Sequence, residues 1–132
     1  LKGPLIDRID ILVSVSRVKF EKIISGVSQE KSSDIRKRVI TARDIQRERF
    51  QKEGILLNSE MTPKLLEKYC KISSNVQRII SDYIDSGRLS MRGYSKVLKV
   101  ARTIADLEGS AEIKDEYLLE ALMYRTQQIV ED

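Results

Sequence analysis

The stretch that decides the fold is "GYSKVLKVARTIADLEGS", residues 93–110. Its apolar side chains recur every three or four residues, the spacing that places them on one face of an α-helix. These residues are Tyr94, Val97, Leu98, Ala101, Ile104 and Ala105. Gly109 is a stop signal, because glycine readily adopts the left-handed conformation that ends many helices. We therefore predict a helix with one buried face at the centre of a bundle.

Four cations lie on or beside the same helix: Arg92, Lys96, Lys99 and Arg102. Two interpretations are open for them. They are solvated surface charges, or one of them meets a phosphate group. Arg92 would lie in the first turn, where the helix dipole disfavours a cation, and this slightly favours a purpose for its charge.

Further helices are predicted on both sides of this one. A long helix should begin near Ser33 or Asp34, and its inward face comprises Ile35, Val39, Ala42, Ile45, Arg49 and Phe50. Thr62 followed by Pro63 is typical of a helix start, because threonine caps and proline fits the first turn. The connections are short, which favours antiparallel neighbours in a small bundle of about five helices.

Two more helices complete the predicted bundle. Ser74 with Gln77 fits a capping box, and Gly87 ends that helix. Asp115 is expected to cap the last helix, whose inward residues are Leu118, Ala121, Leu122 and Ile129.

The beginning of the chain has a different pattern. Ile9, Ile11, Val13 and Val15 alternate with other residues, and a period of two with β-branched side chains indicates a strand. A single strand needs neighbours for its amide groups, and no second convincing strand follows. We expect this strand to belong to a sheet formed by residues upstream of residue 1.

The composition limits the function classes. The 132 residues carry 24 basic and 20 acidic side chains, interspersed, with a net charge of +4 and a pI of about 9.2. This favours a mixed solvated surface over a dedicated nucleic-acid domain. The single Cys70 excludes an intrachain disulfide, and the absence of histidine argues against a zinc site. No apolar run is long enough for a membrane span, and we expect a cytoplasmic protein.

No catalytic arrangement is evident within the chain. It has no "GxxxxGK[ST]" phosphate loop and no histidine to act as a base. Cys70 is expected to be a small, half-buried core residue, since no helix start or histidine would activate it.

Two stretches carry a family resemblance. "GPLIDRID" at residues 3–10 and "LSMRGYSKVLKVARTIADLEG" at residues 89–109 resemble the C-terminal part of the magnesium-chelatase-related AAA+ ATPases, in the ComM-like bacterial branch. The resemblance continues in "SSDIRKRVITARDIQRERF", "LLNSEMTPKLLEKYCKIS" and "EIKDEYLLEALMYR", and so covers nearly the whole chain in order.

The resemblance implies a mostly α fold, in which a helical lid follows the last strand of an AAA+ core. Residues 1–31 would be the end of that core and residues 32–132 the lid domain. Arg8 of "DRID" corresponds to the arginine finger of such ATPases, which reaches the γ-phosphate of the nucleotide bound by the neighbouring subunit. Arg92 of "SMRGY" corresponds to the sensor-2 arginine that contacts bound nucleotide. The ordinary alternative for Arg8 is a surface charge paired with Asp7 or Asp10.

The same resemblance implies cofactors and partners. The longer protein would use ATP and Mg²⁺ and assemble into a ring, expected to be a hexamer, whereas the fragment alone would hold no cofactor and would not hydrolyse ATP. The partners would be the core of the same protein, neighbouring subunits, and DNA undergoing branch migration. Alternatives are metal insertion into a tetrapyrrole, a basic helical module that binds nucleic acid directly, and a plain oligomerisation bundle.

Overall fold

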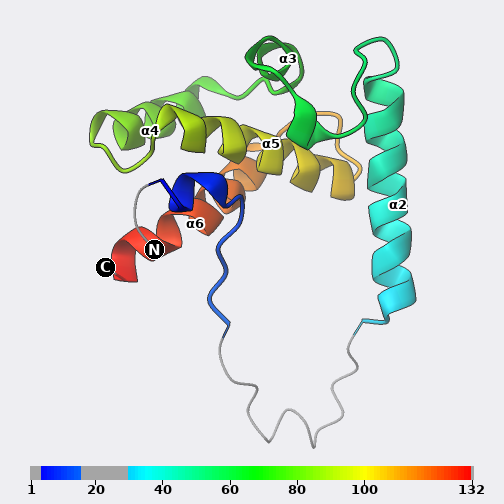
Figure 1. The fold of residues 1–132 in the computed structure, drawn as a ribbon, viewed down its shortest axis with the longest axis horizontal. Coiled ribbons are helices and arrows are strands. Elements are labelled where there is room, and N and C mark those ends of the chain that lie inside the picture. Colours follow the sequence, from blue (N-terminus) through cyan, green and yellow to red (C-terminus); the bar gives the residue numbers. More distant parts are fainter. Residues whose placement is uncertain (1–3, 16–29, 132) are drawn as a thin grey trace, which may run out of the picture.

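The computed structural model describes residues 4–15 and 30–131 of the chain. Within them lie five α-helices and two short 3-10 helices, and these residues form no strand. The elements follow the order η1 (Ile6–Arg8), α2 (Ser32–Arg49), η2 (Asn58–Glu60), α3 (Pro63–Tyr69), α4 (Ser74–Asp85), α5 (Met91–Leu107) and α6 (Asp115–Glu131). The prediction of a mostly helical bundle is confirmed (Figure 1).

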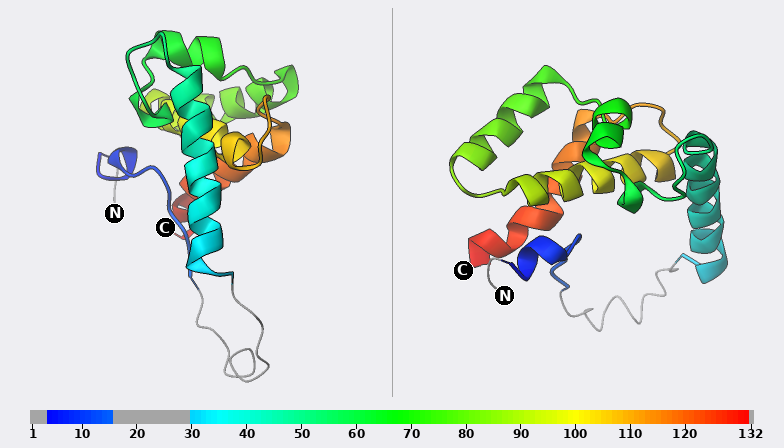
Figure 2. Two further views of the ribbon diagram at one scale, coloured as in Figure 1. Left: turned by 90° about the vertical axis from the view of Figure 1, so that its right-hand side faces the viewer. Right: turned by 45° about the horizontal axis from the view of Figure 1, so that its top comes forward.

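α5 is the central helix of the bundle. It packs most extensively on α6 and also contacts α2, α3 and η2. Figure 2 shows α5 lying between α3 and α6, and α4 also contacts α6. Ala101, Ala105 and Leu118 are completely buried at the contact between α5 and α6, with Val97, Leu98, Ala121 and Leu122 around them. These residues confirm the predicted inward faces of the two helices. Tyr94 and Ile104 are partly buried, and the predicted Ile129 side chain lies outside the part that the structure describes.

Local chemistry explains where the helices begin and end. Thr62 caps α3 as expected, and its Oγ1 accepts a hydrogen bond from the Leu65 amide at 3.4 Å. α4 is capped one residue earlier than predicted. Ser73 has an extended backbone, so its Oγ accepts from the Val76 amide at 3.3 Å, while Ser74 is already helical.

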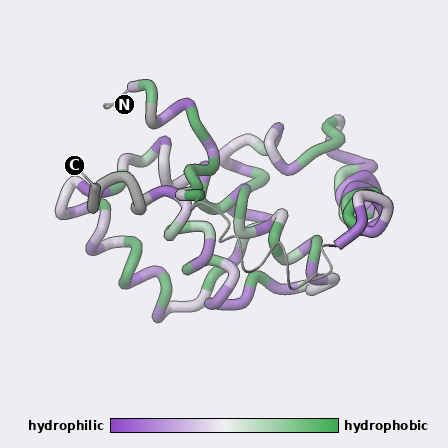
Figure 3. The backbone as a smooth tube through the Cα atoms, turned by 90° about the horizontal axis from the view of Figure 1, so that it is seen from below, coloured by the Kyte–Doolittle hydropathy of each residue, from purple (hydrophilic) through white to green (hydrophobic). Residues whose placement is uncertain are grey.

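α2 differs from its prediction. Its last two turns pack against the bundle and bury Ala42 and Gln46, but Ile35 and Val39 are exposed. Figures 1 and 3 show why: the helix stands across the other helices, and its first half extends beyond them. Ile35 and Val39 instead border an open groove of about 610 Å³, together with Ile104 and Leu107 of α5.

The predicted strand is wrong for the residues that the structure describes. Ile9 to Val15 form no ladder and follow η1 as an irregular segment. No neighbouring strand is available among the described residues, and the backbone pairs with a helix end instead: the Leu12 amide donates to the Tyr124 carbonyl of α6 at 3.0 Å. The rest of the predicted upstream region, residues 1–3 and 16–29, lies outside the described residues.

Candidate functional site at the start of α5

Arg92 is the second residue of α5 and is exposed. Among the residues whose side chains the structure describes, which end at Arg125, its guanidinium makes no ion pair and no hydrogen bond. The positive end of the helix dipole lies in this first turn, so the cation does not stabilise the helix there. Its charge is therefore available for an anion in front of the helix.

Arg8 ends η1 and is also exposed. The two carboxylates that would pair with it in the ordinary interpretation are used elsewhere. Asp7 lies 3.3 Å from Arg125 Nη2, and Asp10 lies 2.5 Å from Lys96 Nζ. In the described part of the chain, no acidic side chain pairs with Arg8.

A hydrogen bond brings these two arginines to the same end of α5. Ser90 caps α5 by accepting from the Gly93 amide at 3.0 Å, and its Oγ donates to Asp7 Oδ1 at 3.1 Å. Arg8 directly follows Asp7, and Arg92 lies two residues after Ser90. The two exposed cations thus flank a bond that joins their segments.

The same Asp7 oxygen accepts a second donor, which sequence reasoning missed. Arg125 of α6 is buried, and its guanidinium contacts Asp7 Oδ1 and donates to the Ile9 carbonyl. Arg125 continues the inward stripe of Leu118, Ala121 and Leu122 at helical spacing. The sequence did contain a signal for this contact: a cation on an otherwise apolar helix face. Such a charge needs a partner when it is buried.

Gly93 leaves room for this arginine. A Cβ atom at that position would lie 3.2 Å from Arg125 Nε and 3.0 Å from Leu89 Cδ1. The glycine of "SMRGY" is therefore a packing requirement at the start of α5. Its absent side chain lets α6 bring Arg125 up to the N-terminal segment.

Arg102 is not a solvated surface charge, which was the first of the two interpretations open for the cations of this helix. It is buried, and its guanidinium donates to the Ser110 carbonyl at 2.9 Å and the Ala111 carbonyl at 3.1 Å. It also lies near Asp106, with 3.4 Å between Nε and Oδ1, although Nε has no partner with hydrogen-bond geometry in the described residues. Burial, followed by repulsion from Arg49, lowers the pKa of Arg102. The "VARTIADLEGS" motif is thus largely structural.

Asp106 is the centre of that buried network. Its carboxylate accepts two bonds from Arg49 of α2, at 2.9 and 2.5 Å, and one from Asn58 Nδ2 at 2.9 Å. Asn58 is held in turn by Gln46, whose side-chain oxygen accepts from the Asn58 amide at 2.9 Å. The network joins α2, η2 and α5.

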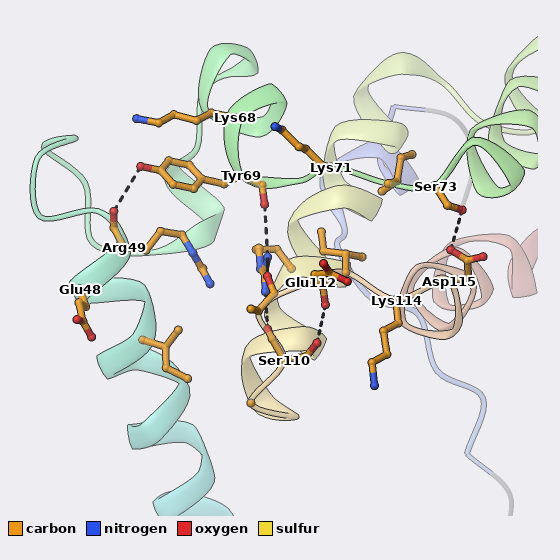
Figure 4. Close-up of a pocket in the computed structure, with 16 residues that line it drawn as sticks. Glu48, Arg49, Lys68, Tyr69, Lys71, Ser73, Ser110, Glu112, Lys114 and Asp115 are labelled. Carbon is orange, nitrogen blue, oxygen red and sulfur yellow. Dashed lines mark hydrogen bonds between the residues drawn. The ribbon is translucent and has the colours of Figure 1, made fainter.

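A cleft of about 1050 Å³ lies beside this network, between the end of α2 and the start of α6 (Figure 4). Its rim is mixed in charge, with Lys68, Lys71 and Lys114 among Glu48, Glu112 and Asp115. Near this cleft, hydrogen bonds from Lys68 and Tyr69 hold the pKa of Glu53 below its usual value. In the same cleft the Ser73 hydroxyl donates to Asp115 Oδ1 at 2.7 Å, and Ser73 Oγ also accepts from the Val76 amide as the cap of α4.

Cys70 is a core residue, as predicted, and is more deeply buried than expected. Desolvation raises the pKa of its thiol to about 11. The thiol is therefore protonated at neutral pH and unreactive, since the thiolate is the nucleophile.

The described residues offer neither a metal site nor a membrane span. No group of three or more His, Cys, Asp or Glu residues there is placed to hold a metal ion. No helix among them has the length and apolarity needed to cross a membrane.

Comparison with known proteins identifies relatives of the whole chain. The chain is 36% identical to the competence protein ComM of Haemophilus influenzae over 126 residues, which is 95% of this chain and 24% of that protein. It is 34% identical to the uncharacterized protein YifB of Salmonella typhimurium over 126 residues, with the same shares. An uncharacterized protein of Mycobacterium tuberculosis is 33% identical over 125 residues, 95% of this chain and 25% of its own length. The chain spans about a quarter of the length of these relatives.

A family match gives the same assignment and confirms the resemblance noted from "SMRGY" and "VARTIADLEGS". Residues 29–125 match the family described as "Magnesium chelatase, subunit ChlI C-terminal". This range contains all of α2 to α5 and most of α6. The chain is therefore a member of the magnesium chelatase ChlI C-terminal family, on the side of its ComM-like proteins.

Proposed function

We propose that the chain is the C-terminal lid of a ring-forming AAA+ ATPase, which senses bound ATP and couples hydrolysis between subunits. Residues 1–31 would end the ATPase core and residues 32–132 would form the lid. The observation that supports this most is the placement of Arg8 and Arg92. Both are exposed, lack acidic partners among the described residues, and flank the Asp7–Ser90 hydrogen bond.

Phosphate chemistry explains what two exposed arginines would contribute to ATP hydrolysis. Negative charge on the γ-phosphate must be stabilised during transfer, and a guanidinium binds phosphate oxygens through two parallel N–H groups. Arg92 would read nucleotide from the lid, and Arg8 would reach a nucleotide bound by the neighbouring subunit of a ring, expected to be a hexamer. Because Arg8 would come from another subunit, hydrolysis would depend on assembly. The longer protein would bind ATP with Mg²⁺ through residues outside this chain and would work in the cytoplasm.

We further propose DNA as the substrate on which the whole protein acts, by branch migration. Support comes from the similarity to a protein named for competence and from the ComM-like sequence stretches. Tetrapyrrole metal insertion is the alternative that the wider family name suggests.

A helical module that itself binds nucleic acid is the less favoured alternative. Of the four cations near α5, Arg102 is buried in internal hydrogen bonds and Lys96 pairs with Asp10. These contacts leave fewer cations for phosphates than the sequence suggests. Binding of DNA by this chain alone should accordingly depend only weakly on salt concentration, since few counterions would be released.

The test uses the full-length protein that carries this chain. We expect Arg8→Ala and Arg92→Ala each to lower ATP hydrolysis strongly, with Arg8→Ala near the roughly thousandfold loss that accompanies removal of a finger arginine. Arg78→Ala is the matched control, because Arg78 is an exposed arginine on α4. Hydrolysis at the control's level in both variants would contradict the proposal.

A further inference from the structure

One carboxylate oxygen connects three parts of the fold at the candidate site. Asp7 Oδ1 accepts from Ser90 Oγ, the cap of α5, at 3.1 Å and from Arg125 Nη2 of α6 at 3.3 Å. We name these three residues, Asp7, Ser90 and Arg125, the Asp7 clasp. The clasp joins the segment that carries Arg8 to the helix that carries Arg92.

Burial of Arg125 makes its contact with Asp7 hard to rearrange. The Arg125 side chain is 4% exposed, and Asp7 is its only carboxylate partner among the described residues. Arg125 also donates to the Ile9 carbonyl, so it holds the segment by backbone and side chain together. Removing Asp7 from this contact would leave a buried guanidinium uncompensated, which is strongly unfavourable.

Two further contacts hold the same segment after Asp7. Lys96 of α5 pairs with Asp10, and the Leu12 amide donates to the Tyr124 carbonyl of α6. Residues 7–12 are therefore fixed to α5 and α6 at successive points. A shift of α5 would carry Arg8 with it.

We propose that Arg125 is a positioning residue that, through Asp7, keeps Arg8 at a fixed place relative to Arg92. This inference rests on the proposed function, in which both arginines face nucleotide phosphates. Arg125 touches no nucleotide itself. Its role is to make the lid and the Arg8 segment move as one body, so that the state read by Arg92 sets the position of Arg8.

Ser90→Asp separates this role from helix stability. Aspartate is as good a helix cap as serine, so the bond from the Gly93 amide is retained. The new carboxylate cannot donate to Asp7 and repels it. In the full-length protein we expect folding and ATP affinity to persist, while the rate constant for hydrolysis falls by about a hundredfold, the scale of a displacement near 1 Å.

Ser73→Asp is a matched control from the same chain. Ser73 caps α4 and donates to Asp115 Oδ1 at 2.7 Å, the same arrangement at a different helix start. The identical substitution there should leave hydrolysis unchanged. A merely structural effect of replacing a capping serine beside an aspartate would affect both variants alike.

A second pair of variants tests Arg125 directly. Arg125→Gln removes the charge, whereas Arg125→Lys keeps a cation near Asp7. We expect Arg125→Gln to lose hydrolysis and Arg125→Lys to recover part of it, with folding of both checked by circular dichroism. Equal losses in the two variants, both folded, would contradict a role through the Asp7 ion pair.

A distance measurement keeps the inference separate from the proposed function. Leu5→Cys and Met91→Cys place probes at exposed positions on the two joined segments, in full-length protein whose other accessible cysteines are replaced. Spin labels there should give a narrow distance distribution that broadens in Ser90→Asp. An unchanged distribution overturns the clasp, whatever the ATPase result. A broadened distribution with normal hydrolysis in Ser90→Asp overturns the positioning role. Normal hydrolysis in both Arg8→Ala and Arg92→Ala overturns the proposed function instead.

Discussion

Arg49 of α2 and Asp106 of α5 form a two-pronged ion pair in which the aspartate side chain is fully buried and the arginine is 12% exposed. The residues are 57 positions apart in the sequence. Arg102 and Asn58 contact the same carboxylate. This pair is the main polar link between α2 and the rest of the bundle.

The first prediction concerns that link. Asp106→Ala leaves Arg49 and Arg102 without their shared carboxylate, and breaking a buried ion pair on one side typically lowers the free energy of unfolding by about 3–5 kcal/mol. Chemical denaturation would measure the loss. Asp44→Ala is the control, because Asp44 is exposed and lies 3.8 Å from Arg47, and surface pairs contribute about 1 kcal/mol or less. Similar losses in both variants would mean that the Asp106 network does not stabilise the fold.

The second prediction concerns Gly93. Alanine within a helix is normally about 1 kcal/mol more favourable than glycine. Here the added Cβ would meet Leu89, Arg125 and Ser90 at 3.0 to 3.3 Å. Overpacking of this kind costs roughly 1–3 kcal/mol, so we expect Gly93→Ala to lower the melting temperature slightly. An increase in melting temperature would show that Arg125 moves aside freely.

The third prediction tests the central position of α5. Leu98 is buried, and Leu98→Asp would place an unpaired carboxylate in the core. We expect this to lower the free energy of unfolding by several kcal/mol, which is comparable to the total of about 5–15 kcal/mol for such a domain. Leu119→Asp on α6 provides the control, since Leu119 is exposed. A folded Leu98→Asp variant with an unchanged melting temperature is the outcome that this packing forbids.

Sequence periodicity predicted the inward faces of α5 and α6 because both helices are packed along most of the described length. It misassigned Ile35 and Val39 because the first half of α2 extends beyond the bundle, and a pattern of apolar residues does not reveal how far a neighbour reaches. The strand at Ile9–Val15 was predicted from alternation alone. The structure pairs that backbone with the end of a helix, a contact between distant residues that no local pattern encodes.

The candidate site was also predictable only in part, because local sequence does not show which distant residues the fold brings together. Motifs drew attention to Arg8 and Arg92, and the structure places them at the same end of α5. Arg102 carries the same kind of charge, yet it is buried, because its partners are carbonyls that follow Gly109. Arg125 lies on an apolar face and was missed, since only the fold brings Asp7 to it.

The fourth prediction is a pH dependence. Burial raises the pKa of Cys70 to about 11, from a usual value of 9.0. The folded state therefore holds the thiol proton more tightly than the unfolded state. The resulting stability is fully present below pH 9 and is lost as the pH rises towards about 11, with a slope of at most about 1.4 kcal/mol per pH unit.

Comparison with Cys70→Ala isolates this contribution from the lysines and tyrosines that titrate in the same range. The free energy of unfolding of the variant should fall less steeply between pH 9 and 11 than that of the unmodified protein. Iodoacetamide at pH 8 should also fail to label Cys70 until the protein unfolds. Rapid labelling of the folded protein would mean that the thiol is accessible.

The last prediction is that Arg8 acts across a subunit boundary. Arg8 follows Asp7 at the end of η1, is exposed, and has no acidic partner among the described residues, so its side chain is free to project from the molecule. Arg8→Ala subunits should bind ATP nearly normally and hydrolyse it poorly. In the full-length protein, they would be mixed with subunits that lack the lysine of the proposed upstream phosphate loop, each variant being inactive alone. Mixed rings should regain hydrolysis, because some interfaces then combine an intact nucleotide site with an intact Arg8. If mixed assembly is verified with a separate tag on each variant and activity still does not return, Arg8 serves its own subunit or only the fold.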